Sequence, residues 1–140
     1  MELERELAYR TKLAVGYLDE ARADLELSRW RSCVDNSQLS VENAAKAALV
    51  RLGPVGKTHA PSIRIRTALE GKQVPEAESR AYSLLAELAE KLGPGVHVAS
   101  DYGDEASWLT PWEIFGEEDA RSAFGLAEQA TACLRHLLAP

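Results

Sequence analysis

An alanine-rich segment, residues 32–53, constrains the fold of this chain more than any other part of its sequence. Its apolar residues recur every three or four positions, which is the spacing of one buried face of an α-helix. Alanine also has the highest intrinsic helix propensity. The residues of this face are Val41, Ala44, Ala45, Ala48, Leu49 and Leu52. We therefore expect a central helix that begins with Ser32 as its N-cap and stops at Gly53-Pro54.

Four other segments have the same helical spacing. Long helices are expected over residues 3–28, 75–92 and 117–138, and a short helix over residues 61–71. Gly93-Pro94-Gly95 is expected to end the third long helix, and residues 96–116 are expected to form a long loop because they lack a sustained helical period. Mostly short connections between long helices favour an antiparallel arrangement. We therefore predict an all-α fold, an antiparallel up-and-down bundle of four long helices plus one short helix, in a single domain of residues 1–140.

Charge and cysteine content limit the classes of function. The net charge of -6 argues against general polyanion binding by the whole surface. The two cysteines, Cys33 and Cys133, are far apart and form no CxxC pair, so the sequence indicates neither a zinc site nor a disulfide. No apolar run approaches the roughly 20 residues of a membrane span, and the first residues lack the positive charge of a secretory signal. We expect a cytoplasmic protein without membrane association, cofactor or bound metal.

A basic segment, residues 43–69, contains no acidic residue. Its basic side chains are Lys46, Arg51, Lys57, His59, Arg64 and Arg66. They could gather into a local nucleotide- or anion-binding site where the central helix ends and the short helix begins. The alternative is that they are solvent-exposed side chains, some of them paired with carboxylates elsewhere in the chain.

The charge pattern is inverted in an acidic segment, residues 97–120. It contains no Lys or Arg, and its acidic residues are Asp101, Asp104, Glu105, Glu113, Glu117, Glu118 and Asp119. This segment could dock onto the basic segment, within one chain or across a dimer. A hard-cation site is less favoured because no regular ligand spacing is present. Its aromatic residues are predicted to pack the loop against the bundle or to contact a second subunit, and they are Tyr102, Trp108, Trp112 and Phe115.

Several short motifs occur in an order that resembles a known family. The motifs are the series Gln38, Glu42, Lys46 and Ala47, then a glycine and His59, then Tyr102-Gly103-Asp104 and Glu118-Asp119-Ala120. From about Leu7 to Leu138, their order and spacing resemble the HEPN superfamily. Members of that superfamily are helical domains of prokaryotes and higher eukaryotes that often accompany minimal nucleotidyltransferases.

The resemblance implies an up-and-down helical bundle, frequently a homodimer, with nucleotide or RNA as the usual ligand. Several members of the superfamily are metal-independent ribonucleases that use an Arg followed four to six residues later by a His. None of the histidines of this chain, His59, His97 and His136, has an Arg at that spacing. Asp101 also stands where the family's Arg-Tyr-Pro-Asp type of segment has its Arg.

Three hypotheses follow. The leading one is a non-catalytic, dimeric HEPN-like binding module that recognises a nucleotide, a nucleic-acid phosphate or a minimal nucleotidyltransferase partner, as in a toxin-antitoxin two-component system. The first alternative is a metal-independent ribonuclease with a displaced active site built from His59 and nearby arginines. The second alternative is a purely structural dimer.

Overall fold

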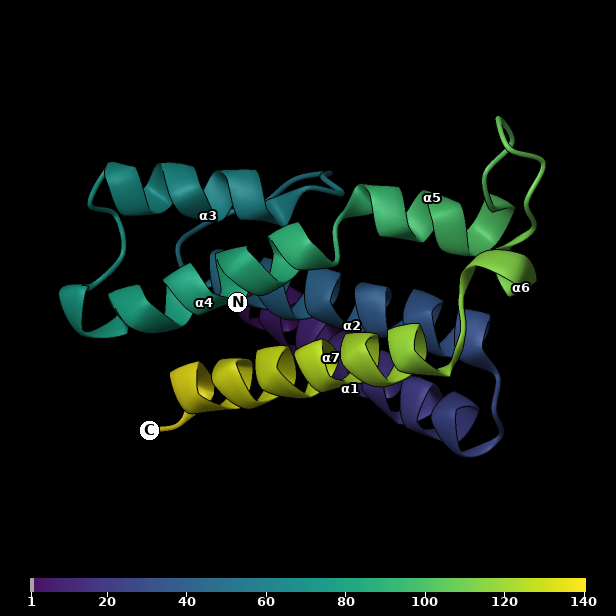
Figure 1. The fold of residues 1–140 in the computed structure, drawn as a ribbon. Helices are drawn as coiled ribbons and strands as arrows, with labels where there is room; N and C mark the ends of the chain where they lie inside the picture. The colour runs from purple at the N-terminus through teal and green to yellow at the C-terminus, as the bar shows by residue number, and fades with distance from the viewer. Residues whose placement is uncertain (1) are drawn as a thin grey trace.

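A computed structural model of the chain describes residues 2–140 (Figure 1). Its elements in chain order are α1 (Glu2–Glu26), α2 (Trp30–Val50), α3 (Pro61–Glu70), the 3-10 helix η1 (Glu76–Glu78), α4 (Ser79–Lys91), α5 (Pro94–Tyr102), α6 (Pro111–Ile114) and α7 (Glu117–Leu138). Within these residues the only β-type pairing is an isolated bridge between Asp104 and Leu109. The prediction of an all-α bundle is confirmed.

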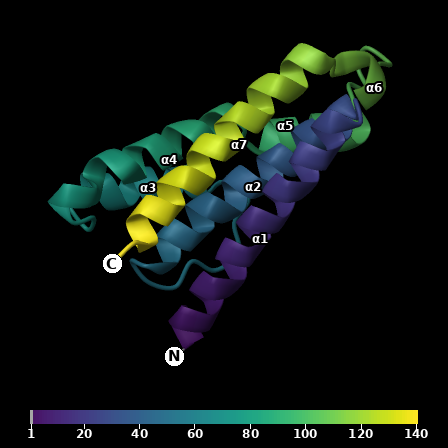
Figure 2. The ribbon, with the colours of Figure 1, turned by 90° about the horizontal axis from the view of Figure 1, so that it is seen from below.

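The helix α2 lies at the centre of the bundle. It runs antiparallel to α1. The helices α4 and α5 then run in the opposite direction to α2, and α7 returns, which gives the up-and-down order (Figure 1). Seen from below, α2 lies between α1 and α7 (Figure 2). Residues of α2 contact every other α-helix of the described chain. Because α2 touches so many neighbours, its side chains must be small where those helices meet.

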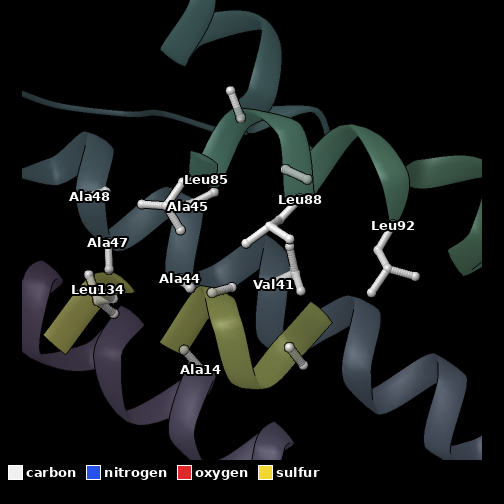
Figure 3. Close-up of a cluster of buried hydrophobic side chains, with 14 of the residues drawn as sticks. Ala14, Val41, Ala44, Ala45, Ala47, Ala48, Leu85, Leu88, Leu92 and Leu134 are labelled. Atoms are coloured by element: carbon white, nitrogen blue, oxygen red, sulfur yellow. The ribbon is translucent and has the colours of Figure 1, made fainter. Parts of the chain in front are cut away.

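The alanine face of α2 forms the middle of the hydrophobic core. Its residues from Val41 to Ala48 are buried, and side chains of α4 and α7 pack against them, with Leu85 and Leu88 from α4 and Leu134 from α7 (Figure 3). The short alanine side chains let these larger side chains fill the space between the helices. The predicted buried face therefore corresponds to the observed core.

The start of α2 differs from the prediction. The helix begins at Trp30, and Ser32 is not its N-cap: the N-cap position is Arg29, and no side chain caps the helix. The Ser32 hydroxyl instead donates a hydrogen bond to Asp24 Oδ2 at 2.8 Å, and the Asn36 amide donates to the same oxygen at 2.8 Å. Asp24, buried near the end of α1, thus fixes the α1–α2 turn and draws Ser32 away from a capping role.

The prediction of a long loop over residues 96–116 is wrong. Residues 94–102 form α5 and residues 111–114 form α6. Pro94 occupies the first turn of α5, where the missing N–H costs nothing because those N–H groups have no helical partner. The Gly93-Pro94 sequence therefore ends one helix and starts the next.

Candidate functional site

The basic segment begins with a buried ion pair. Lys46 Nζ lies 3.2 Å from Glu42 Oε2, and both residues are only 6% exposed. His59, whose side chain is 80% exposed, places its Nδ1 3.5 Å from the other carboxylate oxygen, Glu42 Oε1. The Gln38 amide also donates to that oxygen, at 3.4 Å. The charge of Lys46 is therefore balanced inside the bundle.

Two arginines of the basic segment form bidentate ion pairs with carboxylates of η1 and α4. Arg51 donates to both carboxylate oxygens of Glu78, at 2.8 and 3.0 Å. Arg66 does the same with Glu90, at 2.8 and 3.4 Å. The hydrogen bonds from these arginines lower the pKa of Glu78 and of Glu90 below its usual range.

The remaining cations of the segment, Lys57 and Arg64, have no carboxylate within 4 Å among residues 2–140. Arg64 lies beside Gly56 and lines a small cavity at the end of α2. Four of the six predicted residues therefore contact one of three carboxylates, those of Glu42, Glu78 and Glu90. The other two, Lys57 and Arg64, have no carboxylate partner among residues 2–140. Ligand binding by this segment stays a prediction.

The predicted aromatic residues fall into two groups. Phe115 is partly buried against the core, so it packs the α6 region onto the bundle. The other three are exposed, Tyr102 to 68%, Trp112 to 73% and Trp108 to 87%. Within residues 2–140, no carboxylate of the acidic segment forms an ion pair with the basic segment. A role for the exposed aromatic residues in dimer contacts stays a prediction.

A polar cluster that sequence spacing does not reveal lies where α5 crosses α2. His97 of α5 places Nδ1 3.3 Å from Asp35 Oδ1 and Nε2 3.6 Å from Asp101 Oδ2. Arg31 of α2 lies 3.8 Å from Asp35 and 3.6 Å from Asp101, and it donates to the Ser100 carbonyl at 3.0 Å. Arg31 and His97 therefore both contact the carboxylates of Asp35 and Asp101.

This cluster has its own electrostatics. Burial raises the pKa of Asp35 above its usual value, and nearby Asp101 raises it further, while the hydrogen bond from Ser100 opposes these effects. The potential ligand atoms of Asp35, His97 and Asp101 lie within 4.8 Å of one another, a set that can hold a metal ion. Arg31 already supplies a positive charge between the two carboxylates, so the cluster can be balanced without an added cation.

A cavity of about 540 Å³ opens beside the cluster, at the N-terminus of α2. It is lined by Ser28, Arg29, Trp30, Arg31, Ser32, Trp112 and Phe115. The Arg31 guanidinium stacks over the Trp112 ring, 5.8 Å from its centroid. The Nε of Arg31 is buried and has no hydrogen-bond partner among the described residues. Because no side chain caps α2, its first backbone N–H groups face this end of the helix without a side-chain partner in residues 2–140.

This cavity combines two cations, a helix N-terminus and three aromatic rings. Arginines and uncapped helix N-termini bind phosphate groups, and aromatic rings stack on bases. The Arg29-Trp30-Arg31 sequence by itself indicates only a turn between two helices. Its pairing with Trp112, more than 80 residues away, depends on the packing of α6.

Comparisons with known proteins agree with the fold. The sequence model of the HEPN domain family matches residues 9–137. The crystal structure of TT1696 from Thermus thermophilus is similar, with a TM-score of 0.66 and 19% sequence identity. The alignment covers 93% of this chain and 96% of that chain. No curated protein matches the chain significantly.

The family match supports a nucleotide-binding or ribonuclease-like module in general. Within residues 2–140, no helix combines the length and apolarity needed to cross a lipid bilayer. The family match extends over nearly the whole length of the chain. The chain belongs to the HEPN domain family.

Proposed function

We propose that this chain is a non-catalytic HEPN binding module that recognises the phosphate and base of a nucleotide or of an RNA end. The observation that carries this proposal is the convergence of Arg29, Arg31, Trp30 and Trp112 on one cavity at the uncapped N-terminus of α2. The proposed site therefore lies at the opposite end of α2 from the basic segment.

Each group in the cavity has a distinct role in this proposal. The Arg29 side chain is 62% exposed and can reach a phosphate from the rim. In the Arg31 guanidinium, Nη1 donates to the Ser100 carbonyl and Nε is buried, which leaves Nη2 as the donor for a phosphate oxygen. The ring of Trp112 offers a stacking surface, which contributes roughly 1–3 kcal/mol per base in single-strand binding.

Titration of the purified chain with ATP and with a 5′-phosphorylated RNA oligonucleotide tests the proposal. Arg29→Glu and Trp112→Leu are expected to weaken binding. Both side chains are exposed, but Arg29 lies 3.9 Å from the buried Asp24, so a thermal melt of each variant checks that the fold is kept. Arg121→Glu is the matched control, since Arg121 is 62% exposed and pairs only with Glu117 on its own helix. Binding that survives Arg29→Glu but is lost in Lys57→Glu/Arg64→Glu would move the site to the basic segment.

A second candidate function, RNA cleavage, is favoured by one observation. Arg31 and His97 lie over the same pair of carboxylates, so they could act together although their sequence spacing differs from that of the family's ribonucleases. His59 is the residue that the sequence suggests for this role. Incubation of an RNA substrate with the wild-type chain, His97→Ala and His59→Ala distinguishes the two sites. No cleavage by any of the three supports the non-catalytic proposal.

A homodimer and a minimal nucleotidyltransferase partner, as in a toxin-antitoxin system, also remain proposals for this chain. Sedimentation velocity distinguishes a monomer of 15.3 kDa from a dimer. A gene for a nucleotidyltransferase beside the gene for this chain would support the two-component arrangement, which co-purification of the two proteins would then test.

A further inference from the structure

The outer face of α5 is apolar and has no partner within residues 2–140. Val98, Ala99 and Tyr102 recur at helical spacing on this face, and with Ile114 of α6 they line a hollow of about 690 Å³. Val98 is 54% exposed. The opposite face of the same helix, which carries Ser100, is buried against α2. The exposed face is therefore an apolar surface that the fold leaves uncovered.

A tight turn closes one end of this hollow. Backbone hydrogen bonds join Asp104 and Leu109 in both directions, at 2.8 and 3.0 Å, and Asp104 Oδ1 accepts from the N–H groups of Ala106 and Ser107. Gly103 precedes the turn with φ 75°, and a Cβ there would collide with the Leu109 carbonyl oxygen. The turn is thus held in one conformation by its own hydrogen bonds and by a glycine that no other residue can replace without a shift of the backbone.

The turn presents Trp108 to solvent in an unfavourable conformation. Trp108 has φ 58°, a region that bulky residues rarely adopt, and its side chain is 87% exposed. The chain therefore bears the cost of this backbone conformation without burying the indole. Strain without a compensating internal contact is characteristic of sites that act on other molecules.

The charged side chains that line the hollow are both negative. Asp104 and Glu105 lie on its lining, and the sequence has no Lys or Arg between Lys91 and Arg121. A two-fold contact between copies of this surface would bring these carboxylates toward each other, because an isologous interface uses the same patch on both subunits. Nucleic acid is disfavoured by the same charge. A partner with positive charge and apolar side chains is complementary to both properties of the surface.

We propose that the surface formed by Val98, Ala99, Tyr102, Asp104, Glu105 and Ile114 docks an amphipathic, basic segment of another protein. Its apolar side chains lie against Val98 and Tyr102, and its Lys or Arg side chains meet Asp104 and Glu105. This docking surface lies outside the nucleotide cavity and shares no lining residue with it, so the failure of either proposal leaves the other standing.

Calorimetric titration of the full chain with a synthetic amphipathic helix of leucine and lysine tests this proposal. A peptide of the same pattern with glutamate in place of lysine is the charge control. We expect one binding site for the lysine peptide, and affinity at least about tenfold lower for Val98→Ser/Tyr102→Ser and for Asp104→Asn/Glu105→Gln. The Asp104→Asn change keeps the oxygen that accepts from Ala106 and Ser107, so the turn is preserved.

A second double variant controls for non-specific attraction to an acidic protein. Glu2→Gln/Tyr9→Ser removes one acidic and one exposed aromatic side chain from a surface of α1, and its affinity is expected to match that of the wild type. Equal affinity in all variants, or equal binding of the glutamate peptide, would overturn the proposal. So would a wild-type dimer that Val98→Ser/Tyr102→Ser dissociates, because the surface would then be a contact between copies of this chain. Displacement of the peptide by oligouridylate from Arg29→Glu as readily as from the wild type would equally overturn the proposal, because RNA would then compete at the docking surface without the exposed arginine of the other cavity.

Discussion

At the residue scale, Tyr82 shows how one side chain joins two helices. Its hydroxyl donates to the Ala48 carbonyl at 2.7 Å and accepts from Arg51 Nη1 at 3.1 Å. Ala48 is in the last turn of α2, where carbonyl groups run out of helical partners. Tyr82, fully buried on α4, supplies the missing donor.

The change Tyr82→Phe should therefore destabilise the fold. The carbonyl of Ala48 would lose its side-chain donor in a buried environment, which costs about 1–3 kcal/mol. Urea unfolding followed by circular dichroism at neutral pH measures this difference. Tyr9→Phe, at an exposed position of α1, is the control and should leave the midpoint unchanged.

The polar cluster predicts a pH dependence at Asp35. Burial raises its pKa in the folded state, so the folded protein holds this proton more tightly than the unfolded chain does. The contribution of Asp35 to the free energy of unfolding is therefore fully present below the usual carboxyl pKa, about 4. It is lost as pH rises through the raised pKa of the folded state. Asp35→Asn should thus gain stability relative to the wild type between about pH 4 and pH 7.

Glu78 supplies a control of opposite sign for that experiment. The hydrogen bond from Arg51 lowers the pKa of Glu78 in the folded state. The contribution of Glu78 to the free energy of unfolding is therefore present above the usual carboxyl pKa and is lost as pH falls through the lowered pKa of the folded state. Glu78→Gln should lose stability relative to the wild type at pH 7 and recover toward it in acid. Unfolding free energies of both variants across this range test the two signs together.

Trp108 gives a third residue-scale prediction. Asparagine tolerates the left-handed region far better than tryptophan does, and the indole is not buried. Trp108→Asn should raise the thermal midpoint by roughly 2–4 °C, equivalent to about 1 kcal/mol. Trp112→Asn, at an exposed position of α6 with ordinary backbone angles, should give no such gain.

At the scale of elements, the helices are predictable to the extent that their signals are local. The alanine face of α2, from Val41 to Ala48, follows from spacing alone and is buried as expected. The start of α2 is not predictable in this way because Asp24 binds Ser32, and that contact forms only when α1 and α2 pack together. The helix α5 has a local signal in Pro94, but Gly93-Pro94-Gly95 indicates the stop of one helix as readily as the start of the next.

The central position of α2 makes its alanines sensitive to size. Ala44 is fully buried where helices meet, so Ala44→Leu should cost about 1–3 kcal/mol by overpacking the core. Ala8→Leu, at an exposed position of α1, is the control and should be nearly neutral. Thermal unfolding of the two variants gives the comparison. A neutral Ala44→Leu would mean that α2 is packed less tightly than the structure indicates.

At the scale of the whole molecule, charge is sorted along the bundle. The chain has a net charge of -6, and its cations gather near both ends of α2. Arg29 and Arg31 meet at one end, within 4 Å of Asp24, Asp35 and Asp101. Arg51 and Arg66 pair with Glu78 and Glu90 near the other end. The sequence identifies the basic residues but not their partners, since ion pairs such as Arg51–Glu78 join residues that are distant in the chain. For the same reason the pairing of Arg31 with Trp112 is not predictable.

This distribution predicts how salt affects binding. If Arg29 and Arg31 both contact phosphates of a single-stranded RNA, the logarithm of affinity should fall with the logarithm of salt concentration with a slope of roughly −1.4. Arg29→Gln should reduce the slope by about half, because one contact is removed. Affinities measured over a series of salt concentrations give both slopes. A slope near zero would contradict phosphate recognition by these arginines.

The exposure of Trp108 also provides an optical reporter. A solvated indole emits at long wavelength and is open to collision with iodide, whereas Trp30 is partly buried against the core. Trp112 lines the cavity at the N-terminus of α2, and Trp108 lies in the turn beside the proposed docking surface. In a variant whose only tryptophan is Trp112, loss of iodide quenching would therefore report occupancy of the cavity. In a variant whose only tryptophan is Trp108, the same loss would report occupancy of the docking surface, and neither measurement needs a label.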